Sequence, residues 1–400
     1  MQEKAKEPEI RFAGFTGAWE QRKFSKLVLI ERGGSPRPID NYITNKSNGI
    51  NWVKIGDAPK EGRYITKTAE KIRPEGVNKS REVFPGDLIL SNSMSFGKPY
   101  IMGIRGCIHD GWLLIRDTNK IFDPIFLCYL LGTDQMLAQY KALASGSTVN
   151  NLNKELVGNT HISLPGKEEQ HVIGEFLQGL DSLLTLHQRK YEKLLNIKKS
   201  MLEKMFPKEG EVVPEIRFKG FTGAWEQRKF GEMANRRSEV SASGNLPRVE
   251  YEDIVSGTGT LNKDVFEKQS QKQGIVFHSG DVLYGKLRPY LQNWLLASFN
   301  GLAVGDFWVL EPQGLNSNYL YRIIQTKQFD EIANQSVGTK MPRADWKLVS
   351  KATFLNPASF NEQRLIGKFF KDIDSLLTLH QRKLEMLKNV KQAFLEKMFV

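Results

Sequence analysis

The chain has 400 residues, of which 40% are hydrophobic and 26% are charged. This composition excludes wholesale disorder, and the length exceeds what one hydrophobic core usually organises, so we expect two folded domains. The formal net charge of +12 favours a polyanionic partner such as nucleic acid, with a basic solvated surface as the plain alternative.

Two further features exclude whole classes of protein. Cys107 and Cys128 are the only cysteines and belong to no Cys/His cluster, so neither a disulfide framework nor a zinc site is predicted. Residues 1–9 lack the apolar core of a signal peptide, and the chain contains no run of 18 apolar residues. We therefore expect a cytoplasmic protein with no membrane partner.

The first predicted element is a short segment, residues 1–24, most of which recurs later in the chain. Residues 8–24 read PEIRFAGFTGAWEQRKF, and residues 214–230 match them at 16 of 17 positions. The second copy begins 206 residues after the first. An internal repeat of this kind indicates one structural role performed twice.

Residues 25–165 are expected to form a domain of short strands, turns and polar loops. A Gly-Asp turn at 86–87 precedes an apolar strand that we predict to end at Pro99-Tyr100. Asparagines in the later loop GSTVNNLN, residues 146–153, can pair with adenine in the major groove, with helix capping as the alternative interpretation. The candidate DNA contacts of this domain are Lys98, Tyr100, Ser147, Thr148, Asn150, Asn151 and Asn153.

Residues 166–206 are predicted to form one long helix. Its apolar residues recur in alternating steps of four and three, which is the signature of a coiled-coil seam. His187 and Lys198 lie in this seam, and we interpret such polar residues as fixing the register of the helices rather than as a catalytic or metal site. The predicted seam residues of this helix are Leu180, Leu184, His187 and Leu194.

Residues 207–230 contain a linker and the second copy of the repeated segment, and residues 231–357 form a second domain unlike the first. A Gly-Asp turn at 280–281 again precedes a strand, in which alternation places Tyr284, Lys286 and Arg288 on one basic face. Such a face can bind phosphates or base edges, although a solvated strand face fits the pattern equally well. With the later loop GTKMPRADW, the candidate DNA contacts are Tyr284, Lys286, Arg288, Tyr290, Thr339, Lys340 and Arg343.

Residues 358–400 are predicted to form a second long helix, started by a capping box at Ser359 and Glu362. The sequence DSLLTLHQRK occurs in both long helices, and the second copy lies 193 residues after the first. Because each helix has an apolar stripe, the simplest burial packs one helix against the other, antiparallel if the repeat is two-fold. The predicted seam residues here are Ile373, Leu377, His380 and Leu387.

These elements predict an α+β fold class with a pseudo-two-fold internal repeat, in which two globular domains are joined by two long helices packed as an antiparallel coiled coil. The constant ends, which are the repeated segments and the long helices, indicate one structural frame shared by both halves. The different middles indicate two ligands, or two sequences of one kind of ligand. The sequence contains no phosphate-binding loop, no dinucleotide-binding glycine motif and no Asn-Pro-Pro motif of an amino-methyltransferase. We therefore expect no catalytic residues and no enzymatic activity in this chain.

Several of these motifs resemble the specificity subunit of type I restriction-modification systems. The resemblance rests on the PEIRF-x-GFTGAWEQRKF repeats, the E-Q-x-x-I-G and DSLLTLHQRK sequences of the helices, and the GD…PY and GTKMPRADW stretches of the middles. It implies that residues 25–165 and 231–357 are two target recognition domains, each reading one half of a bipartite double-stranded DNA sequence. It also implies that the long helices help to dock two methyltransferase subunits.

The resemblance places the chemistry on partner proteins. S-adenosylmethionine is expected on the methyltransferase, which methylates adenine, and ATP and magnesium are expected on separate restriction subunits with motor and nuclease activity, with no cofactor or metal in this chain. Two other classes of function stay open from the residues alone. A fused DNA-modifying enzyme requires a cofactor motif that the sequence lacks, and a coiled-coil scaffold without DNA leaves the two divergent middles unexplained.

Overall fold

The computed structural model describes residues 7–59, 61–92, 96–144, 152–268, 271–335 and 341–400. The chain divides into two compact units, and the division falls inside the two long helices. Unit 1 comprises Met1–Arg189 and Arg382–Val400, and unit 2 comprises Lys190–Gln381. Each unit therefore contains the end of a helix that begins in the other. None of the helices described is both long enough and apolar enough to cross a membrane.

Unit 1 combines strands with short and long helices. Its strands are β1 (Glu20–Lys23), β2 (Leu29–Arg32), β3 (Ile50–Val53), β4 (Tyr64–Ile65), β5 (Glu70–Ile72), β6 (Arg81–Val83), β7 (Leu88–Ser91), β8 (Pro99–Met102), β9 (Gly106–Ile108), β10 (Trp112–Arg116) and β11 (His161–Leu164). Its 3₁₀ helices are η1 (Phe24–Lys26), η2 (Ile39–Asn41), η3 (Ile55–Asp57) and η4 (Pro74–Lys79). Its α-helices are α1 (Pro124–Leu131), α2 (Asp134–Ala144), α3 (Lys154–Gly158) and the first part of α4 (Lys167–Lys204).

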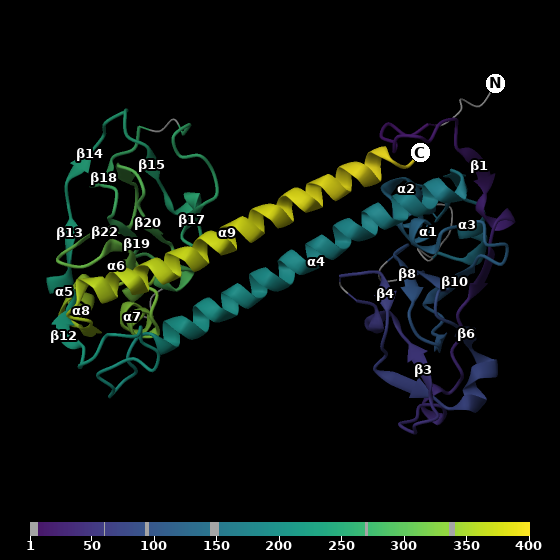
Figure 1. Ribbon diagram of the computed structural model, residues 1–400, viewed down its shortest axis with the longest axis horizontal. Coiled ribbons are helices and arrows are strands. Elements are labelled where there is room, and N and C mark those ends of the chain that lie inside the picture. Colours follow the sequence, from purple (N-terminus) through teal and green to yellow (C-terminus); the bar gives the residue numbers. More distant parts are fainter. Residues whose placement is uncertain (1–6, 60, 93–95, 145–151, 269–270, 336–340) are drawn as a thin grey trace. The chain divides into compact units, whose positions relative to one another are not determined.

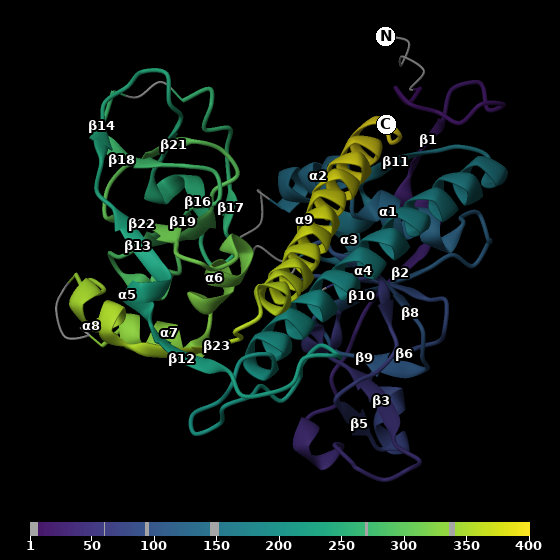
Figure 2. The same ribbon diagram turned by 60° about the vertical axis from the view of Figure 1, so that its left-hand side comes forward.

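The strands of unit 1 form two larger sheets and one pair. A five-stranded sheet has the order β2-β10-β7-β8-β4, a four-stranded sheet has the order β5-β3-β9-β6, and β1 pairs antiparallel with β11. In Figures 1 and 2, β8 and β10 lie between the helices α1 and α2 and the four-stranded sheet that contains β3. The five-stranded sheet is therefore covered on both faces.

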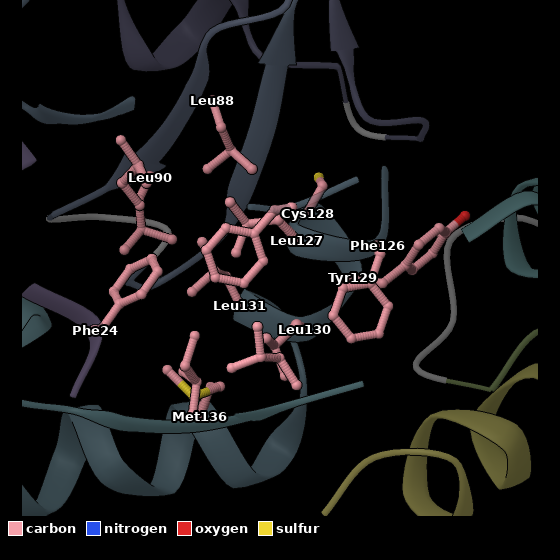
Figure 3. Packing of buried hydrophobic residues seen from close by; sticks show 14 of the residues in the cluster. Phe24, Leu88, Leu90, Phe126, Leu127, Cys128, Tyr129, Leu130, Leu131 and Met136 are labelled. Atoms are coloured by element: carbon pink, nitrogen blue, oxygen red, sulfur yellow. The ribbon is translucent and has the colours of Figure 1, made fainter. Parts of the chain in front are cut away.

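The main core of unit 1 lies between the five-stranded sheet and α1. All residues of β7, the middle strand of that sheet, are buried. Because successive side chains of a strand point to opposite faces, Leu88 and Leu90 join the cluster on the helix side, while Ile89 joins the cluster on the other face. Figure 3 shows Leu88 and Leu90 gathered with Phe24 and with Leu127 of α1. This double coverage explains the continuous apolar run of β7.

Unit 2 has its own sheets and helices. Its strands are β12 (Glu226–Lys229), β13 (Ala234–Arg237), β14 (Val240–Ser241), β15 (Arg248–Val249), β16 (Ile254–Val255), β17 (Thr260–Leu261), β18 (Gly274–Phe277), β19 (Val282–Gly285), β20 (Trp294–Leu296), β21 (Gly301–Ala303), β22 (Phe307–Pro312) and β23 (Thr353–Asn356). Its helices are α5 (Phe230–Met233), η5 (Tyr251–Asp253), η6 (Pro289–Leu291), α6 (Ser317–Ile323), α7 (Lys327–Ala333), α8 (Trp346–Lys351) and the first part of α9 (Phe360–Lys397). The sheets are β13-β22-β19-β20 and β14-β18-β21-β15, with the pairs β12-β23 and β16-β17.

The repeated N-terminal segment anchors the start of a long helix in each unit. In unit 1 the Arg11 guanidinium donates to both carboxylate oxygens of Glu169 on α4, at 2.7 and 2.8 Å. In unit 2 Arg217 binds Glu362 on α9 in the same way, at 2.6 and 2.9 Å. The predicted capping box is half formed, because Ser359 Oγ accepts from the Glu362 N–H at 3.4 Å while the Glu362 carboxylate turns to Arg217.

The end of the other long helix completes each core. In unit 1 Phe399 stacks on Phe126 of α1, with ring centres 5.4 Å apart, and meets Trp19 of the repeated segment edge-on. In unit 2 Phe206 stacks on Tyr319 of α6 at 5.7 Å, and the tryptophan of the second repeated segment meets it edge-on. One set of aromatic contacts therefore occurs twice, each built from both halves of the sequence.

Two unbroken 38-residue helices, α4 and α9, occupy the segments predicted to be long helices (Figure 1). Within unit 1 they run in opposite directions. Phe176 of α4 meets Phe394 of α9 with ring centres 4.8 Å apart, and Asp181, further along α4, binds Lys391, which comes earlier in α9. The mixed α and β content predicted from the sequence is confirmed.

None of the predicted seam residues of the two long helices is exposed. All eight are buried or partly buried, whereas Leu183 and Leu186 on α4 are exposed. Lys198, predicted as a polar seam residue, binds Asp374 at 2.7 Å in unit 2. The eight residues are Leu180, Leu184, His187, Leu194, Ile373, Leu377, His380 and Leu387.

We predict that Arg217→Ala destabilises unit 2 strongly. Glu362 is 1% exposed, so the substitution leaves a buried carboxylate without its bidentate partner, a change that costs roughly 3 to 5 kcal/mol. Urea unfolding of the purified chain, followed by circular dichroism, measures the loss. Arg22→Ala is the matched control, because Arg22 and Glu20 form an exposed pair whose removal should change stability by about 0.5 kcal/mol or less. Equal effects of the two substitutions would contradict this anchoring role.

Candidate nucleic-acid interface

In unit 2 the two polar stretches predicted to contact DNA lie against each other. The first follows β19 and includes η6, and the second precedes α8. The Ala344 N–H donates to Lys286 O, and the Arg288 N–H donates to Pro342 O, both at 2.8 Å. Stretches that are distant in the sequence therefore form one surface, which we call surface 2. Surface 2 consists of residues 286–291 and 341–345.

An acidic side chain holds two of the basic residues of surface 2. Asp306, which precedes β22, binds Arg343 Nη2 at 3.0 Å and lies 3.4 Å from Lys286 Nζ. Burial opposes ionisation of Asp306, but the hydrogen bond from Arg343 and the charge of Lys286 outweigh it and lower the pKa of this carboxyl. Asp306 is therefore ionised and orients both cations, while Arg288 keeps the surface positive overall.

The backbone of surface 2 presents Arg288 and Tyr290 to solvent. Tyr290 is 55% exposed, and the Arg288 side chain is also exposed. Arg288 has the left-handed φ of +51°, which turns the chain sharply at the start of η6. The Tyr251 hydroxyl donates to Asp306 O at 2.5 Å and accepts from the Leu287 N–H at 3.0 Å. These two hydrogen bonds tie the loop to Tyr251.

Two of the predicted contact residues are wrong. Tyr284 is 2% exposed and stacks on Trp308, with ring centres 5.5 Å apart, and Tyr100 is buried edge-on against Trp112. Both tyrosines lie on strands covered on both faces, so alternation along the sequence did not identify a solvent face. The predicted strand end at Pro99 is also wrong, because β7 ends at Ser91 and Pro99 begins β8.

Unit 1 contains the same arrangement of two stretches with different residues. The Leu152 N–H donates to Asn92 O at 3.0 Å, in the place of the bond between Ala344 and Lys286. Asn92 follows β7 as Lys286 follows β19, and its side chain donates to Asp110 O at 2.8 Å. Lys98 is exposed, with its ammonium 5.2 Å from the centre of a neighbouring tyrosine ring. We call residues 92, 96–98 and 152–153 surface 1.

Asn153 takes the role of its alternative interpretation. Its Oδ1 accepts from the Leu156 N–H at 2.8 Å and caps α3, as Asp345 caps α8 in unit 2 through the Lys347 N–H. Its side chain is nevertheless exposed at the edge of surface 1. Six other predicted contacts lie outside the described residues: Ser147, Thr148, Asn150, Asn151, Thr339 and Lys340.

The sequence interpretation missed Asp306 and Tyr251, which organise surface 2. Neither residue lies in a polar loop that stands out in the sequence, and only the pairing of β19 with β22 brings Asp306 to the cluster. Within the described parts of the chain, no three His, Cys, Asp or Glu side chains are grouped to hold a metal ion.

Both halves of the chain match one family of known proteins. The model of the type I restriction modification DNA specificity domain matches residues 17–196 and 223–389. The type I restriction enzyme MjaVIII specificity subunit of Methanocaldococcus jannaschii is 23% identical, over 90% of this chain and 92% of that protein. The type I restriction enzyme EcoDI specificity subunit of Escherichia coli is 22% identical, over 64% of this chain and 65% of that protein.

A solved structure shares the fold. The crystal structure of a type I restriction-modification system S subunit from M. genitalium has a TM-score of 0.65 and covers 98% of this chain and 99% of its own chain. The sequence identity is 16%, so the likeness extends to the fold alone.

We predict that Arg288→Ala and Arg343→Ala each weaken binding to double-stranded DNA by the complex of this chain with the partners that bind it. If an arginine contacts a phosphate, its loss lowers the slope of log K against log salt concentration by about one, for every DNA sequence. If it contacts a base, its loss costs ~1–3 kcal/mol of binding free energy and relaxes the sequence preference at one base pair. Titrations at several salt concentrations distinguish the two. Tyr284→Phe is the control and should bind as the parent does, because this ring is buried. Unchanged binding by both arginine variants would remove surface 2 from the interface.

Proposed function

The chain belongs to the type I restriction modification DNA specificity family, and we propose that it reads a bipartite double-stranded DNA target, with one half-site for each unit. The observation that carries this proposal is the recurrence of one paired-loop arrangement on one frame with different residues in it. The same bond joins the two stretches of each surface, from Leu152 to Asn92 and from Ala344 to Lys286. A shared geometry with different side chains suits two readers of two DNA sequences.

The chemistry of the surfaces supports direct reading of bases. Arginine can donate two hydrogen bonds to guanine O6 and N7 in the major groove, and asparagine can pair with adenine. Arg288 and Arg343 of surface 2 have the first chemistry, and Asn153 of surface 1 has the second. Asp306 supports this reading, because a carboxylate that orients Arg343 opposes DNA phosphates and would only weaken a purely electrostatic contact.

We propose that α4 and α9 form an antiparallel coiled coil that relates the two recognition domains by a pseudo-two-fold axis. The opposite direction of the helices within unit 1 and the low exposure of the predicted seam residues support this packing. In this arrangement the helices set the distance between the two half-sites.

We further propose that the outer faces of the helices dock two methyltransferase subunits. Leu183 and Leu186 on α4 are exposed, and their counterparts Leu376 and Leu379 on α9 are exposed to the same extent. Identical exposed leucines in two copies fit two copies of one partner. The chain itself would be a non-catalytic subunit without a cofactor. S-adenosylmethionine and adenine methylation would belong to the docked subunits, and ATP, magnesium and DNA cleavage to restriction subunits.

Domain exchange tests the bipartite reading. Replacing residues 25–165 by the corresponding segment of a family member should change one half-site and leave the other intact, because both domains meet the same repeated frame. Methylome sequencing of cells that express the variant with its methyltransferase reads both half-sites. A replacement that changes both half-sites together would refute independent reading.

A second experiment tests the docking face. The double substitution Leu183→Glu and Leu186→Glu should weaken capture of the methyltransferase by at least roughly tenfold, because it places charges in the centre of an apolar contact. Met386→Glu is the matched control, since Met386 is an exposed apolar residue of α9 in the same unit whose counterpart on α4 is Lys193. Quantitative co-purification measures both. If the control weakens capture as much as the double variant, the repeated leucines are not the specific contact.

A further inference from the structure

A partly buried aspartate of the repeated frame binds a recognition domain in unit 1. Asp181 on α4 accepts a hydrogen bond from the Tyr129 hydroxyl of α1 at 2.6 Å. Lys391 of α9 binds the same carboxylate, and Arg63, which precedes β4, lies 3.5 Å from it. The Arg63 guanidinium also stacks over the Tyr129 ring, 3.8 Å from its centre. Both long helices and two elements of the recognition domain therefore meet at one carboxylate.

Unit 2 contains the corresponding junction with a different donor. Asp374 on α9 binds Lys198 of α4 and Arg322 of α6, each at 2.7 Å. The Arg322 side chain is 2% exposed, and its guanidinium also lies over the rings of Tyr321 and Phe370. Burial lowers the pKa of Lys198, while the charge of Asp374 opposes this change.

The frame residues of the two junctions are repeats of each other, but the donors from the recognition domains are not. Asp374 and Lys391 are the counterparts of Asp181 and Lys198, at the spacing of 193 residues that relates the two helices. At the same spacing, the counterpart of Arg322 is Tyr129, and unit 1 supplies its guanidinium from Arg63 instead. The two domains thus bring a guanidinium to counterpart aspartates from different elements.

Stability alone does not account for these junctions. A buried ion pair is often no more stable than apolar residues of the same size, because both charges lose their hydration. A charged hydrogen bond does have directional geometry, and it fixes the angle between the groups it joins. By contrast, Lys368 and Asp372 form an exposed pair within α9 and join no second element.

We infer that Asp181 and Asp374 are positioning residues that set how each recognition domain is oriented on the long helices, and through this the spacer length accepted between the two half-sites. This inference rests on the proposed bipartite function. The lysine from the other helix holds the aspartate in place, and the recognition domain docks its guanidinium on the remaining face. Any recognition domain that supplies such a donor at this point can use the same frame.

Methylation at matched DNA sites tests the inference. The parent complex and the complex with Asp374→Asn are given DNA with the parental half-sites and a spacer of parental length, or one base pair shorter or longer. We expect the preference of Asp374→Asn for the parental spacer to fall by roughly tenfold, equivalent to about 1.4 kcal/mol, with the half-site sequences unchanged. Arg322→Met should have the same effect, and Arg322→Lys should keep most of the preference.

Two further variants complete the test. Asp372→Asn is the matched control, because it removes an exposed carboxylate from the same helix, and it should behave as the parent. If Asp374→Asn yields no folded complex, Asp181→Asn repeats the test in unit 1. There the asparagine side chain can still accept the hydrogen bond from the Tyr129 hydroxyl. An equal loss of methylation at all spacers, or an unchanged preference, would overturn the positioning role. Failure of the parent complex to methylate any bipartite site would instead refute the proposed function.

Discussion

The closing of each core by a helix from the other half of the sequence is the constraint on which the rest of the structure depends. Phe399 stacks on Phe126 in unit 1, and Phe206 stacks on Tyr319 in unit 2. Neither unit therefore has a complete core without both long helices. This requirement explains why the ends of the two halves are nearly identical while the middles differ, since each middle has to fit the same helix end, the same tryptophan and the same arginine anchor.

The proposed interface depends on this frame in a direct way. Surface 2 is assembled from the residues that follow β19 and from the loop before α8, and Asp306 before β22 holds it, so it lies at the end of strands that are buried on both faces. The frame fixes the sheet, and the sheet fixes the loops, whereas the Arg288 and Tyr290 side chains of the loop are exposed to solvent. Exposed loop side chains can therefore change without a change of fold, which suits the proposed reading of two different half-sites.

The sequence was most informative where one signal extends over many residues. The alternating steps of four and three predicted both long helices, and the repeats predicted that one structural role is performed twice. It was least informative at Tyr100 and Tyr284, because a strand covered on both faces has no solvent side for alternation to identify. Asp306 could not be predicted from its neighbours in the chain, since its role arises from strand pairing across distant residues.

In both units the repeated segment contacts the end of a long helix, but the length of chain between the two partners differs greatly. In unit 2 the Ile216 N–H donates to Lys204 O, which lies only a short loop earlier in the chain, whereas the same bond in unit 1 joins Ile10 to Lys397. Gln135 likewise reaches Phe399 across 264 residues. During synthesis on the ribosome, unit 2 can form this contact and complete its core as soon as its own residues have emerged. The aromatic face of α1 stays uncovered until Phe399 has been made, so unit 1, the first to be translated, is the last to finish folding and the one that a chaperone would need to shield.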